Sequence, residues 1–273
     1  MLYWNLFAGA KIRIAAGLLY HTVNPSELVL WRRQRRRDLL AAREATGAAA
    51  RADRGRRISG ALLAGFSLLE TARLAIYWPV RGEFDPRFVA RALRARGATI
   101  GLPVITGRTL PLVFREWHPG IELLDGGMGI PYPASSPEII PDACLIPAVG
   151  FDALGFRLGY GAGFFDRTLA ALSPRPLAIG TADESARIDT IFPQPHDIAL
   201  DFMVTENGIH VARAAGLERI DAMQANRIAG ELVSARRRAH AAAGTPADGR
   251  FSSPVCYARD AAPGYFGEPD RED

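Results

Sequence analysis

Short apolar runs alternate with helix-like segments between residues 74 and 206, and this alternation constrains the fold more than any other feature. The run ACLIPAV is continuously apolar, as expected for a strand covered on both faces of a parallel sheet. Helices are predicted from Asp85 to Leu93 and over GFFDRTLAAL. Further strands are predicted over LAIYW, ATIGLPVI, LPLVF, PLAIGTA and DFMVTE. The pattern predicts an α/β fold with an open, mostly parallel sheet covered by helices on both faces.

A helix is predicted before this region, and an extension is predicted at each end of the chain. Asn24 is the expected N-cap of the first helix, because Pro25 follows at the position that proline favours. The predicted α/β domain covers residues 24–211, and residues 1–23 precede it as an extension. Residues 212–273 form a second extension, partly helical and then rich in Gly, Pro and Ser, where we expect disorder.

Targeting signals are weak in this sequence. The apolar stretch before Asn24 is interrupted by Lys11 and Arg13, so neither a secretory signal nor a membrane-spanning helix is predicted. The two cysteines form no C-x-x-C pair, which favours a reducing compartment. We therefore expect a cytoplasmic protein, and we expect it to be a monomer.

The segment GFRLGYGAGFFD, residues 155–166, is the most informative for function. Its glycines let a ligand approach the backbone closely, and the start of the following helix favours an anion. Arg157 adds a cation, and Asp166 adds an oxygen ligand of the kind that Mg²⁺ prefers. Lys11 is the only lysine, so the loop G-x-x-x-x-G-K-[ST] is excluded. We interpret the segment as a Mg-nucleotide site; a tight turn with glycines selected for packing is the alternative.

Two other segments carry charged candidates. Arg32 and Arg36 share one face of the first helix, where they could hold a terminal phosphate or simply meet water. Trp78 ends the strand LAIYW, and Glu83 lies in the loop that follows. A carboxylate beyond the carboxyl end of a strand can accept hydrogen bonds from an amino-bearing heterocycle. The alternative is an exposed loop acid beside a core tryptophan.

The remaining candidates are less specific. Met128 lies in the rigid loop DGGMGIPYP and could line a pocket or cover the core. Asp201 starts the strand DFMVTE and could join Asp166 at a metal ion. His196 and Asp197 form a pair suited to acid–base work, but a structural role is favoured because no nucleophile motif is nearby.

These segments, in this order, resemble the 5-formyltetrahydrofolate cyclo-ligases, also called methenyltetrahydrofolate synthetases. FDALGFRLGYGAGFFDRTL is similar to the family pattern F-D-x-x-G-x-R-L-G-x-G-x-G-[YF]-[YF]-D, and the resemblance covers about residues 30–211. A basic helix, a P-x-x-x-E loop, a G-I-P-x-P loop and an H-D-x-x-x-D strand follow the family order. The resemblance implies the open α/β fold of sugar-phosphate isomerases and CoA transferases.

The same resemblance implies an enzyme, an ATP-dependent C–N ligase. It implies conversion of 5-formyltetrahydrofolate to 5,10-methenyltetrahydrofolate, with Mg²⁺ bound and with release of ADP and phosphate. The implied partner is a small reduced folate, and neither nucleic acid nor a membrane is expected. Two alternatives stay open: a non-catalytic nucleotide- or folate-binding paralogue, and an RNA-associated protein that uses the arginine-rich helix.

Roles for individual residues are implied by the family pattern. The catalytic residues are implied to be Arg157 and Arg36, and the Mg²⁺ ligands Asp166 and Asp201. The folate contacts are implied to be Trp78, Glu83 and Met128. The implied ATP-binding set is Arg32, Arg36, Arg157, Leu158, Gly159, Tyr160, Gly161, Ala162, Gly163, Phe164 and Phe165.

Three departures from the family pattern motivate the paralogue alternative. Arg32 stands where the family has a lysine, and a forked guanidinium does not replace a compact ammonium without consequence. Phe164 and Phe165 lack the hydroxyl of the tyrosines that are common there. Ala162 lies where some members carry a lysine.

Overall fold

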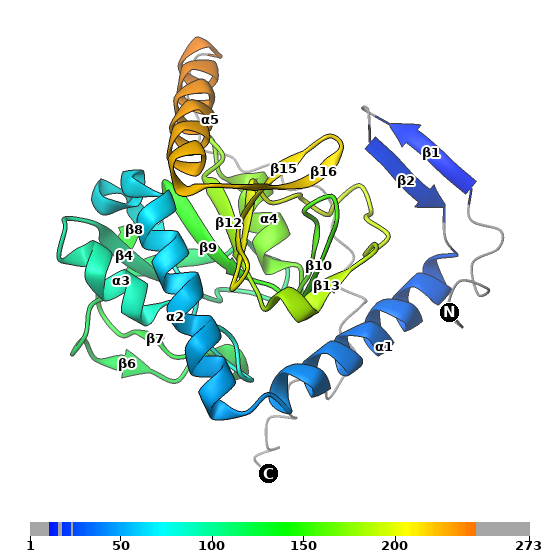
Figure 1. Cartoon of the computed structure of the whole chain (residues 1–273). Helices are drawn as coiled ribbons and strands as arrows, with labels where there is room; N and C mark the ends of the chain where they lie inside the picture. The colour runs from blue at the N-terminus through cyan, green and yellow to red at the C-terminus, as the bar shows by residue number, and fades with distance from the viewer. Residues whose placement is uncertain (1–10, 16–17, 23, 244–273) are drawn as a thin grey trace.

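The computed structural model describes residues 11–15, 18–22 and 24–243 of the 273-residue chain. Its centre is a mixed nine-stranded sheet (Figure 1). In spatial order the strands are β16 (Gly216–Ile220), β15 (Gly208–Arg213), β14 (Phe202–Thr205), β12 (Leu177–Thr181), β9 (Ala143–Pro147), β3 (Arg73–Ala75), β4 (Thr99–Val104), β5 (Val113–Glu116) and β8 (Glu138–Ile139). Strands β14 to β4 run parallel, and antiparallel strands extend the sheet at both edges. The predicted α/β class, with a mostly parallel centre, is confirmed.

Helices and smaller strand pairs surround this sheet. The α-helices are α1 (Pro25–Glu44), α2 (Ala48–Gly65), α3 (Arg87–Arg94), α4 (Phe164–Ala171) and α5 (Ala222–Ala242). A three-stranded sheet is formed by β10 (Gly150–Asp152), β11 (Arg157–Leu158) and β13 (Arg187–Ile188). Two hairpins are formed by β1 (Lys11–Ala15) with β2 (Leu18–Thr22), and by β6 (Leu123–Leu124) with β7 (Tyr132–Pro133). Short 3₁₀ turns are η2 (Ser67–Thr71), η3 (Gly127–Gly129) and η4 (Glu184–Ala186).

Two apolar layers sandwich the central sheet, because successive residues of a strand point to opposite faces. Leu145 of β9 belongs to the layer that contains apolar residues of α2, α3 and α5. Its neighbours Cys144 and Ile146 belong to the other layer, together with Leu169 of α4. Figure 1 shows α2 crossing one face of the sheet. The continuous apolar run of β9 is thus explained by burial on both faces.

The first helix differs from the others, because arginines fill much of its buried face. Asn24 caps α1 as predicted: its side chain accepts a hydrogen bond from the Ser26 amide at 3.0 Å. The buried residues of α1 are Leu28, Arg32, Arg36, Leu40 and Arg43. A face of this composition contacts polar groups, so α1 contributes to a site as well as to the core.

The C-terminal part of the described chain continues the sheet. Strand β15 spans residues 208–213 and so crosses the predicted boundary between the domain, which ends at residue 211, and the C-terminal extension, which begins at residue 212. Residues 216–220 form β16 and not helix, because the turn at Gly216 (φ 130°) returns the chain against β15. Helix α5 starts only after Asp221, whose carboxylate accepts from the Gln224 amide in a capping box. The stretch 244–273, where we expect disorder, lies outside the described residues.

Residues 1–23, the expected N-terminal extension, are described only in part. Strands β1 and β2 pair antiparallel within it, with Lys11 opposite Thr22 and Ala15 opposite Leu18. None of the helices within the described ranges is both long and apolar enough to cross a membrane.

Candidate functional site

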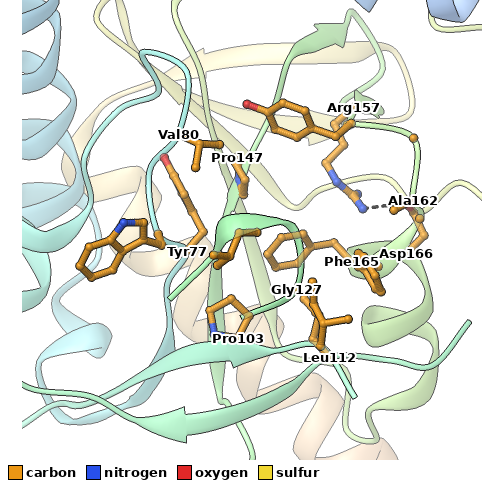
Figure 2. Close-up of a pocket in the computed structure, with 18 of the residues that line it drawn as sticks. Tyr77, Val80, Pro103, Leu112, Gly127, Pro147, Arg157, Ala162, Phe165 and Asp166 are labelled. Carbon is orange, nitrogen blue, oxygen red and sulfur yellow. Dashed lines mark ion pairs between the residues drawn. The ribbon is translucent and has the colours of Figure 1, made fainter. Parts of the chain in front are cut away.

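A cavity of about 790 Å³ opens at the carboxyl ends of the parallel strands (Figure 2). Val104 and Pro147, the last residues of β4 and β9, line its wall together with Tyr77, which follows β3. Ligands of open α/β sheets bind at this edge, and the volume suits a small-molecule ligand. Of the predicted site residues, those that line the cavity are Arg32, Arg36, Trp78, Glu83 and every residue from Arg157 to Asp166.

The glycine loop, residues 159–163, joins β11 to the start of α4. Gly161 (φ 103°) and Gly163 (φ 66°) adopt left-handed conformations that favour glycine. A Cβ on Gly161 would also lie 3.3 Å from the Arg36 guanidinium and would crowd it. Gly159 differs, because a Cβ there would meet nothing within 4 Å among the described residues. Gly161 therefore packs against Arg36, whereas Gly159 leaves space through which a ligand can approach the backbone.

Arg36 fixes this loop from α1. Its Nε donates a hydrogen bond to the carbonyl oxygen of Gly159 at 2.8 Å. The guanidinium lines the cavity, as does that of Arg32 on the same helix face. A cation at this position, together with the N-terminal turn of α4, favours an anionic ligand.

Arg157 and Asp166 bracket the loop and pair with each other (Figure 2). Nη2 of Arg157 lies 2.8 Å from Oδ2 of Asp166, and Oδ1 of Asp166 accepts from the Ile198 amide at 3.0 Å. Nη1 of Arg157 donates to the Ile198 carbonyl at 3.3 Å. The two charges that we assigned to phosphate and metal are thus held together at one end of the cavity.

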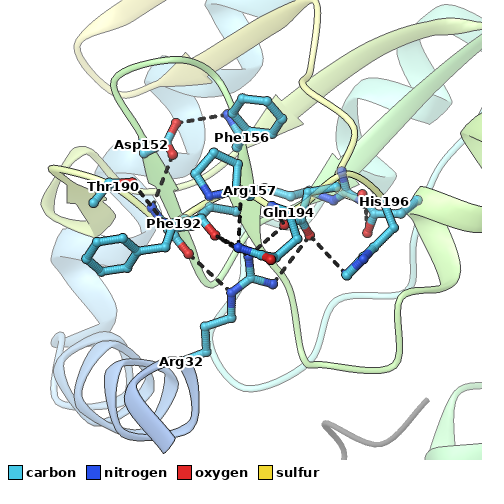
Figure 3. A network of polar contacts seen from close by, with 12 residues as sticks. Arg32, Asp152, Phe156, Arg157, Thr190, Phe192, Gln194 and His196 are labelled. Carbon is cyan, nitrogen blue, oxygen red and sulfur yellow. Dashed lines mark hydrogen bonds and ion pairs between the residues drawn. The ribbon is translucent and has the colours of Figure 1, made fainter. Parts of the chain in front are cut away.

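Arg32 is the centre of a separate network (Figure 3). Its Nη2 lies 2.6 Å from Oδ2 of Asp197, and its Nε and Nη2 donate to the carbonyls of Ile191 and Phe192. Asp152 holds the same segment from the other side, because it accepts from the Ile191 amide at 3.1 Å. These acceptors lie in several directions, which suits the planar guanidinium of arginine and not the compact ammonium of lysine. His196 contacts Asp197 only at 3.9 Å, so the principal partner of Asp197 is Arg32.

Asp201 does not reach the cavity, which corrects its assignment as a metal ligand with Asp166. It lies at the amino end of β14, whereas the cavity lies at the carboxyl ends of the strands. Its carboxylate pairs with Arg175 and Arg236, each at 2.6 Å, and accepts from the Ala178 amide. Within the described residues, no group of three or more His, Cys, Asp and Glu side chains is placed to hold a metal ion.

A single carboxylate is nevertheless compatible with Mg²⁺ at a nucleotide. Mg²⁺ is usually held by one or two carboxylates, with phosphate oxygens and water as the other ligands. Asp166 lies at the start of α4 and lines the cavity beside the glycine loop. The donor set near the loop therefore fits a metal ion that arrives with a triphosphate, and not one held by the protein alone.

Glu83 occupies the opposite wall in a tight turn. The chain turns through Arg81 (φ 50°) and Gly82 (φ 75°), and the Val80 amide donates to Glu83 Oε2 at 3.0 Å. The Tyr160 hydroxyl donates to Oε1 at 2.9 Å. Burial raises the pKa of Glu83, although the Val80 hydrogen bond and the charge of Arg43 act to lower it. The side chain is only 3% exposed, which excludes the alternative of an exposed loop acid.

Trp78 and Met128 are the other predicted folate contacts. Trp78 lines the cavity, and the Arg87 guanidinium lies 4.5 Å from the centre of its ring. Trp78 also packs against the core, so it contributes both to the cavity wall and to the core. The side chain of Met128 lies outside the described residues, although Gly127 and Ile130 on either side line the cavity.

Sequence reasoning missed Arg43, which contacts Glu83 from α1. It lies two helical turns after Arg36 and therefore on the same face, which is the signal that could have identified it. The buried arginines of α1 point toward this site and do not form an exposed basic patch. Any RNA contact by α1 would therefore rest on its exposed arginines, Arg33 and Arg37, and not on the buried ones.

Comparisons with known proteins agree on one family. Residues 29–206 match the model of the 5-formyltetrahydrofolate cyclo-ligase family. The chain is 37% identical over 139 residues to a 5-formyltetrahydrofolate cyclo-ligase of Mycolicibacterium smegmatis, covering 47% of this chain and 71% of the relative. It is 29% identical over 143 residues to the enzyme of that name from Escherichia coli K12, covering 50% and 79%.

Solved structures agree with the fold. The 5,10-methenyltetrahydrofolate synthetase of Aquifex aeolicus has a TM-score of 0.59 at 23% identity, covering 70% of this chain and 96% of that one. The synthetase of that name from Mycoplasma pneumoniae has a TM-score of 0.54 at 22% identity, covering 64% and 98%. At these identities the likeness supports the architecture and not the roles of individual residues.

Proposed function

Because this chain belongs to the 5-formyltetrahydrofolate cyclo-ligase family, we propose that it converts 5-formyltetrahydrofolate to 5,10-methenyltetrahydrofolate and consumes ATP. One observation carries the proposal. A single cavity is lined by a glycine loop, two arginines and a buried carboxylate, together with apolar side chains. A triphosphate and an amino-bearing heterocycle need the loop and the carboxylate within reach of each other. We also propose that the enzyme acts as a cytoplasmic monomer.

The glycine loop is the proposed ATP site. Amides at the start of α4 and the open backbone at Gly159 suit phosphate oxygens. Arg36 and Arg157 add guanidinium groups, which bind phosphate in forked geometry. Mg²⁺, when bound with the nucleotide at Asp166, would neutralise phosphate charge.

The wall around Glu83 is the proposed folate site. An ionised carboxylate accepts hydrogen bonds from the amino and ring N–H groups of a pterin. Trp78 and Ile130, with Met128 as a further proposed contact, supply apolar surface for the ring system. The Tyr160 hydroxyl of the glycine loop donates a hydrogen bond to Glu83 at 2.9 Å, so the two proposed sites adjoin each other.

The proposed reaction is a phosphoryl transfer followed by ring closure. The formyl oxygen attacks the γ-phosphorus, and the bond from that phosphorus to ADP breaks. The amine at position ten then attacks the formyl carbon, loses its proton to water, and phosphate leaves with the former formyl oxygen. Arg157 and Arg36 would stabilise charge on the transferred group and hold it in line, which is the main task in phosphoryl transfer.

The proposal is tested with the purified full chain, 5-formyltetrahydrofolate, MgCl₂ and ATP, by following the near-ultraviolet absorbance of the methenyl product. Arg157→Ala is expected to reduce kcat at least ~100-fold, the scale for loss of one charge-stabilising donor. Arg54→Ala is the matched control, because Arg54 pairs with Asp183 outside the cavity. ATP binding without product formation in the wild type would support the non-catalytic paralogue instead.

A further inference from the structure

Arg43 contacts Glu83 from α1 and is not among the residues that line the cavity. The side chain of Arg43 is 6% exposed, and its Nη2 donates to the carbonyl oxygen of Ala148, which follows β9. Its Nη1 is buried and makes no hydrogen bond among the described residues. This nitrogen lies 3.7 Å from Oε1 of Glu83, so the carboxylate is a counter-charge for an otherwise uncompensated buried group.

The turn that carries Glu83 is also built on the stem of Arg43. A Cβ on Gly82 would lie 3.6 Å from Cγ and 3.8 Å from Cδ of Arg43. The left-handed residues Arg81 and Gly82 therefore pass over this stem before the chain reaches Glu83. One arginine thus supports the backbone of the turn and the charge at its end.

We infer that Arg43 is a positioning residue that keeps the Glu83 carboxylate ionised and aimed into the cavity. The inference rests on the proposed function, because it concerns the acid that we assign to the folate. An ionised carboxylate is purely an acceptor, whereas a protonated one presents an O–H donor toward the N–H groups of a pterin. Arg43 would therefore determine whether Glu83 accepts hydrogen bonds from the N–H groups of a pterin.

The other groups that face Glu83 do not replace Arg43. Tyr160 donates from the glycine loop and Val80 from the turn itself, but both are neutral. Tyr77 of the neighbouring wall experiences the charge of Glu83, which together with burial raises the Tyr77 pKa. Arg81 pairs with Glu44 at 2.6 Å at the rim. Burial already raises the pKa of Glu83, so removal of the Arg43 charge would raise it further.

A direct test is titration of Glu83 by NMR in protein labelled with ¹³C at the glutamate side-chain carboxyl, with the signal assigned by its loss in Glu83→Gln. In Arg43→Gln the pKa of Glu83 is expected to rise by at least ~1, the scale for loss of an opposite charge at this distance. Arg43→Lys retains the charge and is expected to return the pKa toward its wild-type value. An unchanged pKa in Arg43→Gln overturns the inference.

The functional consequence is tested by the pH dependence of 5-formyltetrahydrofolate binding. The pH below which affinity falls should rise in Arg43→Gln together with the pKa of Glu83, while affinity for a non-hydrolysable ATP analogue stays at the wild-type level. Equal folate profiles in wild type and Arg43→Gln would argue against the role. The NMR titration needs no substrate, so an inactive wild type defeats the proposed function without affecting that test.

A folding defect in Arg43→Gln is also informative. Removing one partner of a buried pair leaves the other charge uncompensated, which is strongly destabilising. If Arg43→Gln unfolds, the double variant Arg43→Gln/Glu83→Gln is expected to recover stability, because no buried charge remains. Failure of the double variant to recover means that Arg43 acts through its contact with Ala148 and not through Glu83.

Discussion

The Tyr160 hydroxyl donates a hydrogen bond to Oε1 of Glu83 at 2.9 Å, although 77 positions separate the two residues in the sequence. Tyr160 belongs to the glycine loop and Glu83 to the turn after β3, so this bond joins the two walls of the cavity. Burial raises the pKa of the Tyr160 hydroxyl, and the charge of Glu83 raises it further. The proposed nucleotide and folate sites are therefore in direct contact before any ligand binds.

Removal of this bond is expected to cost stability. Tyr160→Phe should lower the free energy of unfolding by about 1.5 kcal/mol, because a hydrogen bond to a charged acceptor contributes roughly this much. Urea denaturation measures the change. Tyr132→Phe is the matched control, since Tyr132 lines the same cavity and no hydrogen bond of its hydroxyl is seen among the described residues. Equal losses in both variants would contradict the importance of the bond.

Two glutamates are expected to affect the pH dependence of stability with opposite signs. The pKa of Glu83 is raised by burial, so the folded state binds its proton more tightly than the unfolded state. The stability of the wild type relative to Glu83→Gln should therefore increase as pH falls through the folded pKa of Glu83 toward 4.5. Urea denaturation of both proteins between neutral pH and pH 4.5 measures this difference.

Glu184 supplies the opposite case. Burial acts to raise the pKa of Glu184, but hydrogen bonds from Arg187 and Thr205 outweigh burial and lower it below 4.5. Its contribution is present above pH 4.5 and is lost as pH falls through the folded pKa. The stability of the wild type relative to Glu184→Gln should therefore decrease on acidification. If the stability difference from the Gln variant changed in the same direction with pH for both glutamates, the opposite pKa shifts of Glu83 and Glu184 would be contradicted.

Asp201 is expected to matter for stability and not for metal binding. Asp201→Asn should lower the free energy of unfolding by roughly 3 kcal/mol, the low end for breaking a buried ion pair, because both arginine partners retain some contact with water. Asp142→Asn is the control, since its pairs with Arg73 and Arg237 are more exposed and should cost about 1 kcal/mol or less.

Asp201→Asn, compared with Asp166→Asn, also tests the corrected metal assignment. The Mg²⁺ concentration for half-maximal turnover should be unchanged in Asp201→Asn and raised in Asp166→Asn. A large increase in the Mg²⁺ requirement of Asp201→Asn would restore Asp201 as a ligand.

Arg32 is expected to resist replacement by the lysine that the family has at this position. Arg32→Lys should lower the free energy of unfolding by about 1–3 kcal/mol, because a lysine leaves several buried acceptors around Asp197 and Phe192 without donors. Arg33→Lys on the exposed face of α1 is the control. Chemical denaturation of the two variants measures the change in the free energy of unfolding. An equal change in both would mean that the guanidinium geometry of Arg32 is not needed for stability.

Much of the fold and part of the site could be predicted because their causes are local. The apolar run of β9 reflects burial on both faces, and Asn24 caps α1 through a contact two residues away. The left-handed conformations of Gly161 and Gly163 likewise belong to the loop itself. Each of these features depends on residues that are close together in the sequence: an apolar run, a helix cap or a backbone angle.

Tertiary structure alone decided the partners of the charged side chains. Asp201 pairs with Arg236 from a helix that follows it in the chain, and Arg43 reaches Glu83 from a helix that precedes it. The helical spacing of Arg43 from Arg36 indicates a shared face, but the sequence does not indicate the partner in either pair. An ion pair depends on distance in space and on burial, and both arise only when the sheet is assembled. The sequence determined that a glycine loop and a basic helix exist; packing determined that they enclose one cavity with Glu83.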